Sequence, residues 1–192
     1  MLVNRGVQTF SQAEQFFRPS EKDFLNPFKM LGMYKAVERI KEAIANKENI
    51  LIYGDYDVDG TCSVAMMKHF LETLSTHVFT YQPHREKEGY GLSMTAVDWL
   101  LKEEISLVIT LDCGIKDINA AKKLKQKNTD LIICDHHNPA EILPDAFVIL
   151  NPKQVDCNYN FKELCGCGIG LKLIQGYLNH YKATYDISYA YQ

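Results

Sequence analysis

Residues 50–63 read Ile-Leu-Ile-Tyr-Gly-Asp-Tyr-Asp-Val-Asp-Gly-Thr-Cys-Ser, and the rest of the chain is interpreted from this stretch. The apolar run from Ile50 to Tyr53 predicts a short buried strand. Carboxylates follow it at every second position: Asp55, Asp57 and Asp59. In an extended backbone, residues i, i+2 and i+4 point to one side. We therefore expect the three carboxylates to lie together on a loop between a strand and a helix.

Carboxylates that are packed together with nothing between them repel one another strongly. A hard divalent cation relieves this repulsion, and Mg²⁺ and Mn²⁺ are the ions that carboxylate oxygens suit. The alternative interpretation is an acidic surface turn, because Asp and Gly are both common in turns. The other motifs of the chain are needed to choose between a metal site and a surface turn.

The composition is that of a globular protein without a strong charge bias. The chain has 192 residues, of which 46% are hydrophobic, and its net charge is −3. A polyanionic substrate would therefore need metal ions or a local basic patch for its binding. The six cysteines are scattered, and several lie in apolar runs, which favours a reducing, cytoplasmic location. No apolar run approaches the roughly 18 residues of a membrane span, so none is expected.

Strand and helix patterns alternate along the chain. β-forming runs predict strands at 50–53, 77–82, 106–111, 130–134 and 147–150. Helical spacing of apolar residues predicts helices at 33–47, after residue 61, from a cap at Ser93, after residue 118 and at about 168–181. This alternation predicts an α/β fold with a mostly parallel five-stranded sheet flanked by helices.

Three of the predicted strands end in an acidic residue. Asp55, Asp112 and Asp135 directly follow the strands that start at 50, 106 and 130, and His136 and His137 come next. Parallel sheets bind ligands outside the carboxyl ends of their strands, so these side chains should share one crevice. They offer more ligands than one octahedral ion needs. We therefore predict a two-metal site for displacement at phosphorus, with ions about 3.5–4 Å apart.

Roles can be assigned within this predicted site. Asp112, at the end of a central strand, suits the bridging position between the two ions. Adjacent histidines cannot easily share one orientation, so one should bind metal and the other should face a phosphate or assist proton transfer. Arg85 could pair with phosphate through its guanidinium. The backbone N–H groups of 164–170, which precede a helix, could also bind an anion.

Together these motifs resemble the DHH phosphoesterase superfamily, and within it the bacterial exonucleases specific for single-stranded DNA. The resemblance covers nearly the whole chain and rests on residues 53–61, Arg85 with 89–92, 110–115, Asp135-His136-His137, Asn151-Pro152 and 161–166. It implies a 5′-to-3′ exonuclease of DNA repair and recombination that depends on Mn²⁺ or Mg²⁺. It also implies a parallel sheet, in which we expect the 50–54 strand to be central.

Residue roles carry over from the resemblance position by position. The implied metal-binding residues are Asp55, Asp57, Asp59, Asp112 and His136, and all of them together with His137 form the implied catalytic set. The implied substrate-binding residues are Arg85, His137 and Gly166. Single-stranded DNA is the implied partner, joined in a longer protein by a single-strand-binding protein or a helicase.

The resemblance also implies a domain plan. Residues 1–48 would be a lead-in, with a short helix at 11–17, followed by the helix at 33–47. Residues 49–192 would be a DHH phosphoesterase domain that stops before a further metal-binding Asp found later in the superfamily. We therefore expect an N-terminal piece of a longer protein that is weakly active or inactive alone. Two other functions stay open: a phosphoesterase of the same superfamily for short oligonucleotides or small phosphoesters, and a non-catalytic replication scaffold.

Overall fold

A computed structural model describes residues 2–18 and 20–182 of the chain. Its centre is a five-stranded sheet in which every paired strand is parallel, with the order β2-β1-β3-β4-β5. The strands are β1 (Ile50–Gly54), β2 (Val78–Tyr81), β3 (Leu107–Leu111), β4 (Asp130–Cys134) and β5 (Val148–Leu150). The predicted α/β fold with a parallel five-stranded sheet is confirmed.

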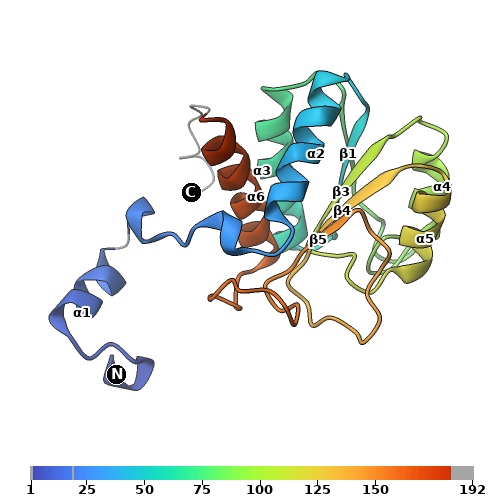
Figure 1. Cartoon of the computed structure of the whole chain (residues 1–192). Coiled ribbons are helices and arrows are strands. Elements are labelled where there is room, and N and C mark those ends of the chain that lie inside the picture. Colours follow the sequence, from blue (N-terminus) through green and yellow to red (C-terminus); the bar gives the residue numbers. More distant parts are fainter. Residues whose placement is uncertain (1, 19, 183–192) are drawn as a thin grey trace.

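Helices cover both faces of the sheet (Figure 1). One face carries α2 (Met33–Ala45), α3 (Val58–Glu72) and α6 (Gly166–Tyr181), whose apolar side chains share one core cluster with the strands. The other face carries α4 (Met94–Leu100) and α5 (Ile118–Gln126), which form a second cluster. Burial on both sides explains why the sequences of β1 and β3 are continuous apolar runs rather than alternating ones.

The register of the sheet brings the acidic strand ends together. Gly54 is paired with Leu111, and Leu111 with Cys134, so the residues that follow these three strands come out at one edge. The chain order reverses between β1 and β3, which is the point where doubly wound sheets bind their ligands. The topology therefore brings the residues that follow β1 and β3 together at this switch point.

Two expectations about geometry are wrong. The middle strand of the sheet is β3, and β1 lies one place away from the centre, because β2 pairs on the outer side of β1. The acidic segment after β1 is also not extended, because α3 already begins at Val58. Asp57 is the N-cap of this helix, and Asp59 lies in its first turn, where it points in another direction.

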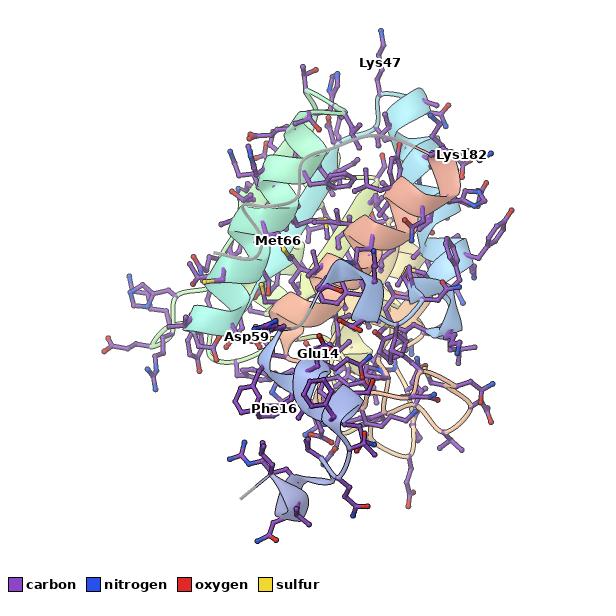
Figure 2. The ribbon with its side chains drawn as sticks, turned by 90° about the vertical axis from the view of Figure 1, so that its left-hand side faces the viewer. Glu14, Phe16, Lys47, Asp59, Met66 and Lys182 are labelled. Atoms are coloured by element: carbon purple, nitrogen blue, oxygen red, sulfur yellow. The ribbon has the colours of Figure 1, made fainter. Side chains whose placement is uncertain are left out.

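The three helices of the first face pack closely beside one another, and Figure 2 shows Met66 of α3 on the side that faces α6. A side chain on Gly170 of α6 would lie 3.2 Å from the Met66 Cε atom, so the missing side chain allows this close approach. This contact is one of many that join α3 to α6.

The segment before α2 lies apart from this body in its residues 2–18 (Figure 1), but Leu25, Phe28 and Met30 near its end pack into the first core cluster. It contains α1 (Phe10–Phe17) and the short 3₁₀ helices η1 (Val3–Arg5), η2 (Glu21–Asp23) and η3 (Pro27–Lys29). Thr9 caps α1 through a capping box with Gln12, and α1 has no buried residue. In the described part of the chain, no helix is both long and apolar enough to cross a membrane.

Candidate metal centre

The first two acids of the quoted stretch lie at the switch point of the sheet. Asp55 directly follows β1 and is 2% exposed, and its Oδ1 atom is buried without a hydrogen-bond partner. Burial raises the pKa of this carboxyl above its usual value. Asp57 is exposed, and its Oδ1 atom accepts a hydrogen bond of 2.9 Å from Gly60 N as the cap of α3.

Asp112 follows β3 in a conformation that few residues adopt. Its φ of +63° lies in the left-handed region, which costs free energy for a residue other than glycine. The side chain is 2% exposed, and Oδ1 has no hydrogen-bond partner. Burial, followed by the nearby charges of Asp59 and Asp57, raises the pKa of Asp112 to about 8. The closest potentially positive group to this carboxylate is the imidazole of His136.

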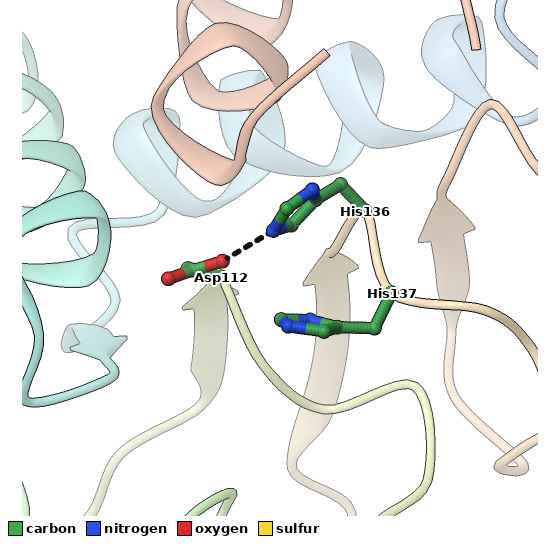
Figure 3. A group of neighbouring side chains, drawn as sticks. All are labelled: Asp112, His136 and His137. Atoms are coloured by element: carbon green, nitrogen blue, oxygen red, sulfur yellow. Dashed lines mark ion pairs between the residues drawn. The ribbon is translucent and has the colours of Figure 1, made fainter. Parts of the chain in front are cut away.

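The two histidines lie beside Asp112, on the loop after β4 (Figure 3). The Nε2 atom of His136 is 3.1 Å from Oδ1 of Asp112, and the centroids of the two imidazole rings are 4.4 Å apart. The expectation that adjacent histidines diverge is wrong, because a third residue holds His137 so that both imidazoles lie close to Asp112. The division of metal-binding and phosphate-binding roles between them stays a prediction.

That third residue is Asp135, which is fully buried. Its Oδ1 atom lies 2.7 Å from His137 Nδ1 and accepts a hydrogen bond of 3.0 Å from His137 N. Its Oδ2 atom accepts one of 2.9 Å from Ile115 N. A carboxylate accepts only, so Nδ1 of His137 carries the proton, and in the neutral ring the lone pair is left on Nε2. Asp135 therefore orients His137 and also holds the loop that follows Asp112.

Two residues to which the sequence assigned no role support the histidine loop. Tyr90 places its hydroxyl 3.1 Å from the carbonyl oxygen of Asp112 and 2.9 Å from His137 Nδ1. The buried Asn151 donates a hydrogen bond of 2.9 Å to the His137 carbonyl oxygen. Both residues belong to motifs quoted above, so the motifs pointed to them, but their partners lie 47 and 14 positions away.

The loop that carries Tyr90 is itself fixed to the sheet. Tyr53 donates a buried hydrogen bond of 2.7 Å to the carbonyl oxygen of Gly91. Asp117 accepts one of 2.6 Å from Leu92 N. Gly91 has a φ of +88°, and a side chain there would lie 2.8 Å from the Asp117 carboxylate, so glycine is required at this position.

The predicted phosphate-binding residues lie in two places. Arg85 is exposed on the loop after β2, and its guanidinium lies 5.3 Å from the ring centroid of Tyr56, which is next to Asp55 in the chain. Gly166 is buried at the start of α6, and its N–H donates to Asp59. The structure thus brings Arg85 near the acidic segment through Tyr56. A contact of either residue with a substrate stays a prediction.

Two sets of potential ligands meet at one residue. Asp55, Asp57 and Asp112 offer oxygens within 4.8 Å of one another, and so do the ligand atoms of Asp112, His136 and His137. Asp112 belongs to both sets. The buried Oδ1 atoms of Asp55 and Asp112 accept no hydrogen bond, and a hard cation would satisfy them. The oxygen-rich donor set with imidazole suits Mg²⁺ or Mn²⁺. The residues therefore fit a divalent metal centre.

Comparisons with known proteins agree with this picture. A family model described as the DHH family, N-terminal domain, matches residues 49–191. The single-stranded-DNA-specific exonuclease RecJ of Bacillus subtilis is 46% identical over 178 residues, which are 93% of this chain and 23% of that protein. The protein of the same name from Escherichia coli is 32% identical over 175 residues, 91% of this chain and 30% of that protein.

Solved structures give the same result. A crystal structure of exonuclease RecJ bound to manganese has a TM-score of 0.76 and 28% identity, and the match covers 84% of this chain and 41% of that one. RecJ from Thermus thermophilus in complex with Mn²⁺ has a TM-score of 0.68 and 25% identity, covering 81% and 22%. The chain thus spans less than a third of the length of the RecJ proteins from Bacillus subtilis and Escherichia coli.

The family model covers residues 49–191, which is well over half of the chain, and the aspartates after β1 and β3 and the Asp135-His136-His137 motif lie within that match. The chain therefore belongs to the DHH family.

Proposed function

We propose that this chain carries a metal-dependent phosphodiesterase centre that hydrolyses single-stranded DNA from its 5′ end, in repair and recombination. The observation that carries the proposal is the pair of ligand sets that share Asp112. The names of the RecJ relatives support the choice of single-stranded DNA, and the Mn²⁺ in two of the related structures supports the choice of metal.

Asp55, Asp57, Asp112 and His136 are the proposed metal-binding residues, with Asp112 shared between two ions. Two such ions would supply electrophilic stabilisation of the attacking and leaving oxygens at phosphorus. Asp59, which the sequence also assigns to the metal, lies at the margin of the site. Its Oδ2 atom is 3.8 Å from His136 Nε2, and both of its oxygens accept hydrogen bonds from α6.

The other residues act on the substrate or on these ligands. Asp135 and Tyr90 fix the imidazole of His137, whose side chain is 39% exposed and can therefore reach a phosphate oxygen or move a proton. Arg85 supplies exposed positive charge beside the acidic segment. A protein with a net charge of −3 needs such a local cation, because its overall charge repels DNA.

The proposal is tested by incubating the chain with Mn²⁺ and 5′-labelled single strands, the matching duplex and a dinucleotide. Release of mononucleotides from the single strand, even at the low rate expected of this piece, supports the exonuclease if it is absent with Asp112→Asn. Cleavage of the dinucleotide alone would support the phosphoesterase of short substrates. A folded chain that binds no Mn²⁺ and cleaves nothing would favour the scaffold. A cytoplasmic location and a helicase or single-strand-binding partner stay predictions.

A further inference from the structure

Asp59 joins the beginning of α3 to the beginning of α6. Its Oδ2 atom accepts a hydrogen bond of 2.7 Å from Gly166 N, and its Oδ1 atom accepts one of 2.7 Å from Cys167 N. Figure 2 places Asp59 at the end of α3 that lies beside the start of α6. Both carboxylate oxygens are thus engaged by backbone groups that lie 107 and 108 positions further along the chain.

The start of α6 depends on this carboxylate for its hydrogen bonds. The residue at the N-cap is Cys165, whose sulfur accepts from Gly168 N at 3.3 Å. Sulfur is a weak acceptor, and cysteine is not among the residues that cap helices well. A carboxylate at this end of a helix gains from charge-assisted hydrogen bonds and from the helix dipole. Asp59 therefore serves as the cap that the local sequence of α6 lacks.

Gly166 in turn lies against Asp112. A Cβ atom on Gly166 would be 2.5 Å from the Asp112 Cβ atom and 2.7 Å from its Oδ1 atom, so the two residues are in tight contact. The Oδ1 atom of Asp112 accepts no hydrogen bond, and its contact with His136 Nε2 at 3.1 Å comes from the side of the histidine loop, not from α6. The backbone at Gly166 is therefore one wall that confines the Asp112 side chain, and Asp59 holds that wall.

We propose that Asp59 is a positioning residue that clamps the N-terminus of α6 over Asp112 and so sets the geometry of the shared carboxylate. The two hydrogen bonds of the clamp are made by groups of this chain alone. Its effect on metal binding rests on the proposed function, because it requires that Asp112 is a ligand.

The clamp is tested first without metal, by hydrogen exchange of the Gly166 and Cys167 amides in EDTA. Asp59→Asn puts an amide nitrogen against one of the two N–H donors, so at least one amide should exchange about tenfold faster. The matched control is Asp57→Asn, which keeps a good cap on α3 and does not contact these amides. If Asp59 only added repulsion to the acidic group, Asp59→Asn would leave both amides as protected as in the parent, or more protected, and the proposal would be wrong.

The effect on Asp112 is tested by Mn²⁺ calorimetry on Asp59→Asn, Gly166→Ala and the double variant, each shown to be folded by circular dichroism. Gly166→Ala replaces none of the proposed ligands, but its added methyl group forces the backbone of α6 and the Asp112 side chain apart. If the contact were purely structural, the two single variants would have lower melting temperatures than the parent and the same Mn²⁺ dissociation constant. We expect each single change to raise the Mn²⁺ dissociation constant several-fold. In the double variant, the fold-increase should be smaller than the product of the two single fold-increases.

Such non-additivity follows because both changes act through the same neighbour. If the two fold-losses of Mn²⁺ affinity multiplied in the double variant, Asp59 would act independently, as a separate metal ligand. If the Mn²⁺ affinity of Gly166→Ala were unchanged, the proposed link between the clamp and Asp112 would be wrong. Neither readout uses DNA, so a chain without nuclease activity can still confirm or overturn the clamp. A parent chain that binds no Mn²⁺ would overturn the metal centre and with it the effect on Asp112, while the exchange experiment would still decide the clamp itself.

Discussion

The Nδ1 atom of His137 lies 2.7 Å from the Oδ1 atom of Asp135, a carboxylate that is fully buried. Buried carboxylates that hold the far nitrogen of an imidazole fix both its ring orientation and its tautomer. Here the same carboxylate also binds Ile115 N in the loop after Asp112. Asp135 thus couples the positions of two parts of the candidate centre.

Replacing Asp135 by Asn should therefore impair the centre without removing a proposed ligand. The amide cannot accept all the hydrogen bonds made by the carboxylate, and its NH₂ group would face a donor. We expect Mn²⁺ affinity or the cleavage rate to fall about 10- to 100-fold. Calorimetry and the rate on single-stranded DNA measure this. Asp145→Asn, which changes an exposed carboxylate paired with Lys125, is the control and should match the parent. Equal values for both variants would contradict the role of Asp135.

Asp112 should make the metal-free protein less stable as the pH rises. Its pKa in the folded chain is raised to about 8 from the ordinary value of 3.8. Between these values the folded state holds a proton that the unfolded state has released, so stability falls as pH increases, by at most about 1.4 kcal/mol per pH unit from this group. The raised pKa of Asp55 acts in the same direction.

Urea unfolding in EDTA at several values between about pH 5 and pH 8 measures this dependence, and the range lies between the two pKa values. Asp112→Asn should show a shallower decline than the parent, because the titrating group is gone. Addition of Mn²⁺ to the parent at the upper end should restore stability, since an ion that binds only the folded state stabilises it. Identical slopes for parent and variant would show that Asp112 does not carry the effect.

Arg85 should contribute to DNA binding and not to metal binding. Its guanidinium is exposed beside Tyr56 and makes no contact with the proposed ligands that the structure records. Arg85→Ala should weaken binding of single-stranded DNA about tenfold and reduce the slope of log affinity against log salt by about 0.7 for one lost phosphate contact.

Titration of a fluorescent single strand at several salt concentrations measures both quantities. Lys87→Ala removes a charge from the same loop and should have the smaller effect, because a guanidinium pairs with phosphate at two points. Mn²⁺ affinity should be unchanged in both variants. A larger loss of DNA affinity with Lys87→Ala would show that Lys87, and not Arg85, makes the main phosphate contact.

Arg39 should be important for stability although it is far from the acidic strand ends. It is 7% exposed and makes ion pairs of 2.6 Å with Glu48 and Asp130. Arg39→Met should lower the free energy of unfolding by about 2 kcal/mol, because it removes a buried cation with which two partly exposed carboxylates pair. The more exposed pair of Lys123 and Asp98 is the control, and Lys123→Met should cost less than about 1 kcal/mol. Equal losses in urea unfolding would refute this distinction.

The elements of the fold could be predicted from local patterns. Runs of β-forming residues identified the strands within one or two residues. Ser93 is the N-cap of α4 as expected, with its hydroxyl accepting from Ala96 N. These features depend on the spacing of buried residues along an element and on hydrogen bonds between residues close in sequence. Short stretches of sequence determine both. The acids at three strand ends could be foreseen in one crevice for the same reason, because parallel strands end at a common edge.

Contacts between distant segments could not be predicted in this way. The sequence pattern of Asp55, Asp57 and Asp59 suggested one extended row, but α3 begins at Val58 and turns Asp59 toward α6. No pattern in either segment encodes that partner, since it results from the packing of α3 and α6 in one apolar cluster. The same holds for the hydroxyl of Tyr90, which meets His137 only because two loops converge.

The sequence alone thus determined the class of fold, the edge of the sheet that carries the acids, and the metal chemistry that they favour, because these follow from residue type and spacing. The tertiary structure decided which carboxylate holds a helix and which one orients a histidine. Those roles depend on the direction of each side chain and on its neighbours after packing, and long-range burial rather than local propensity sets both.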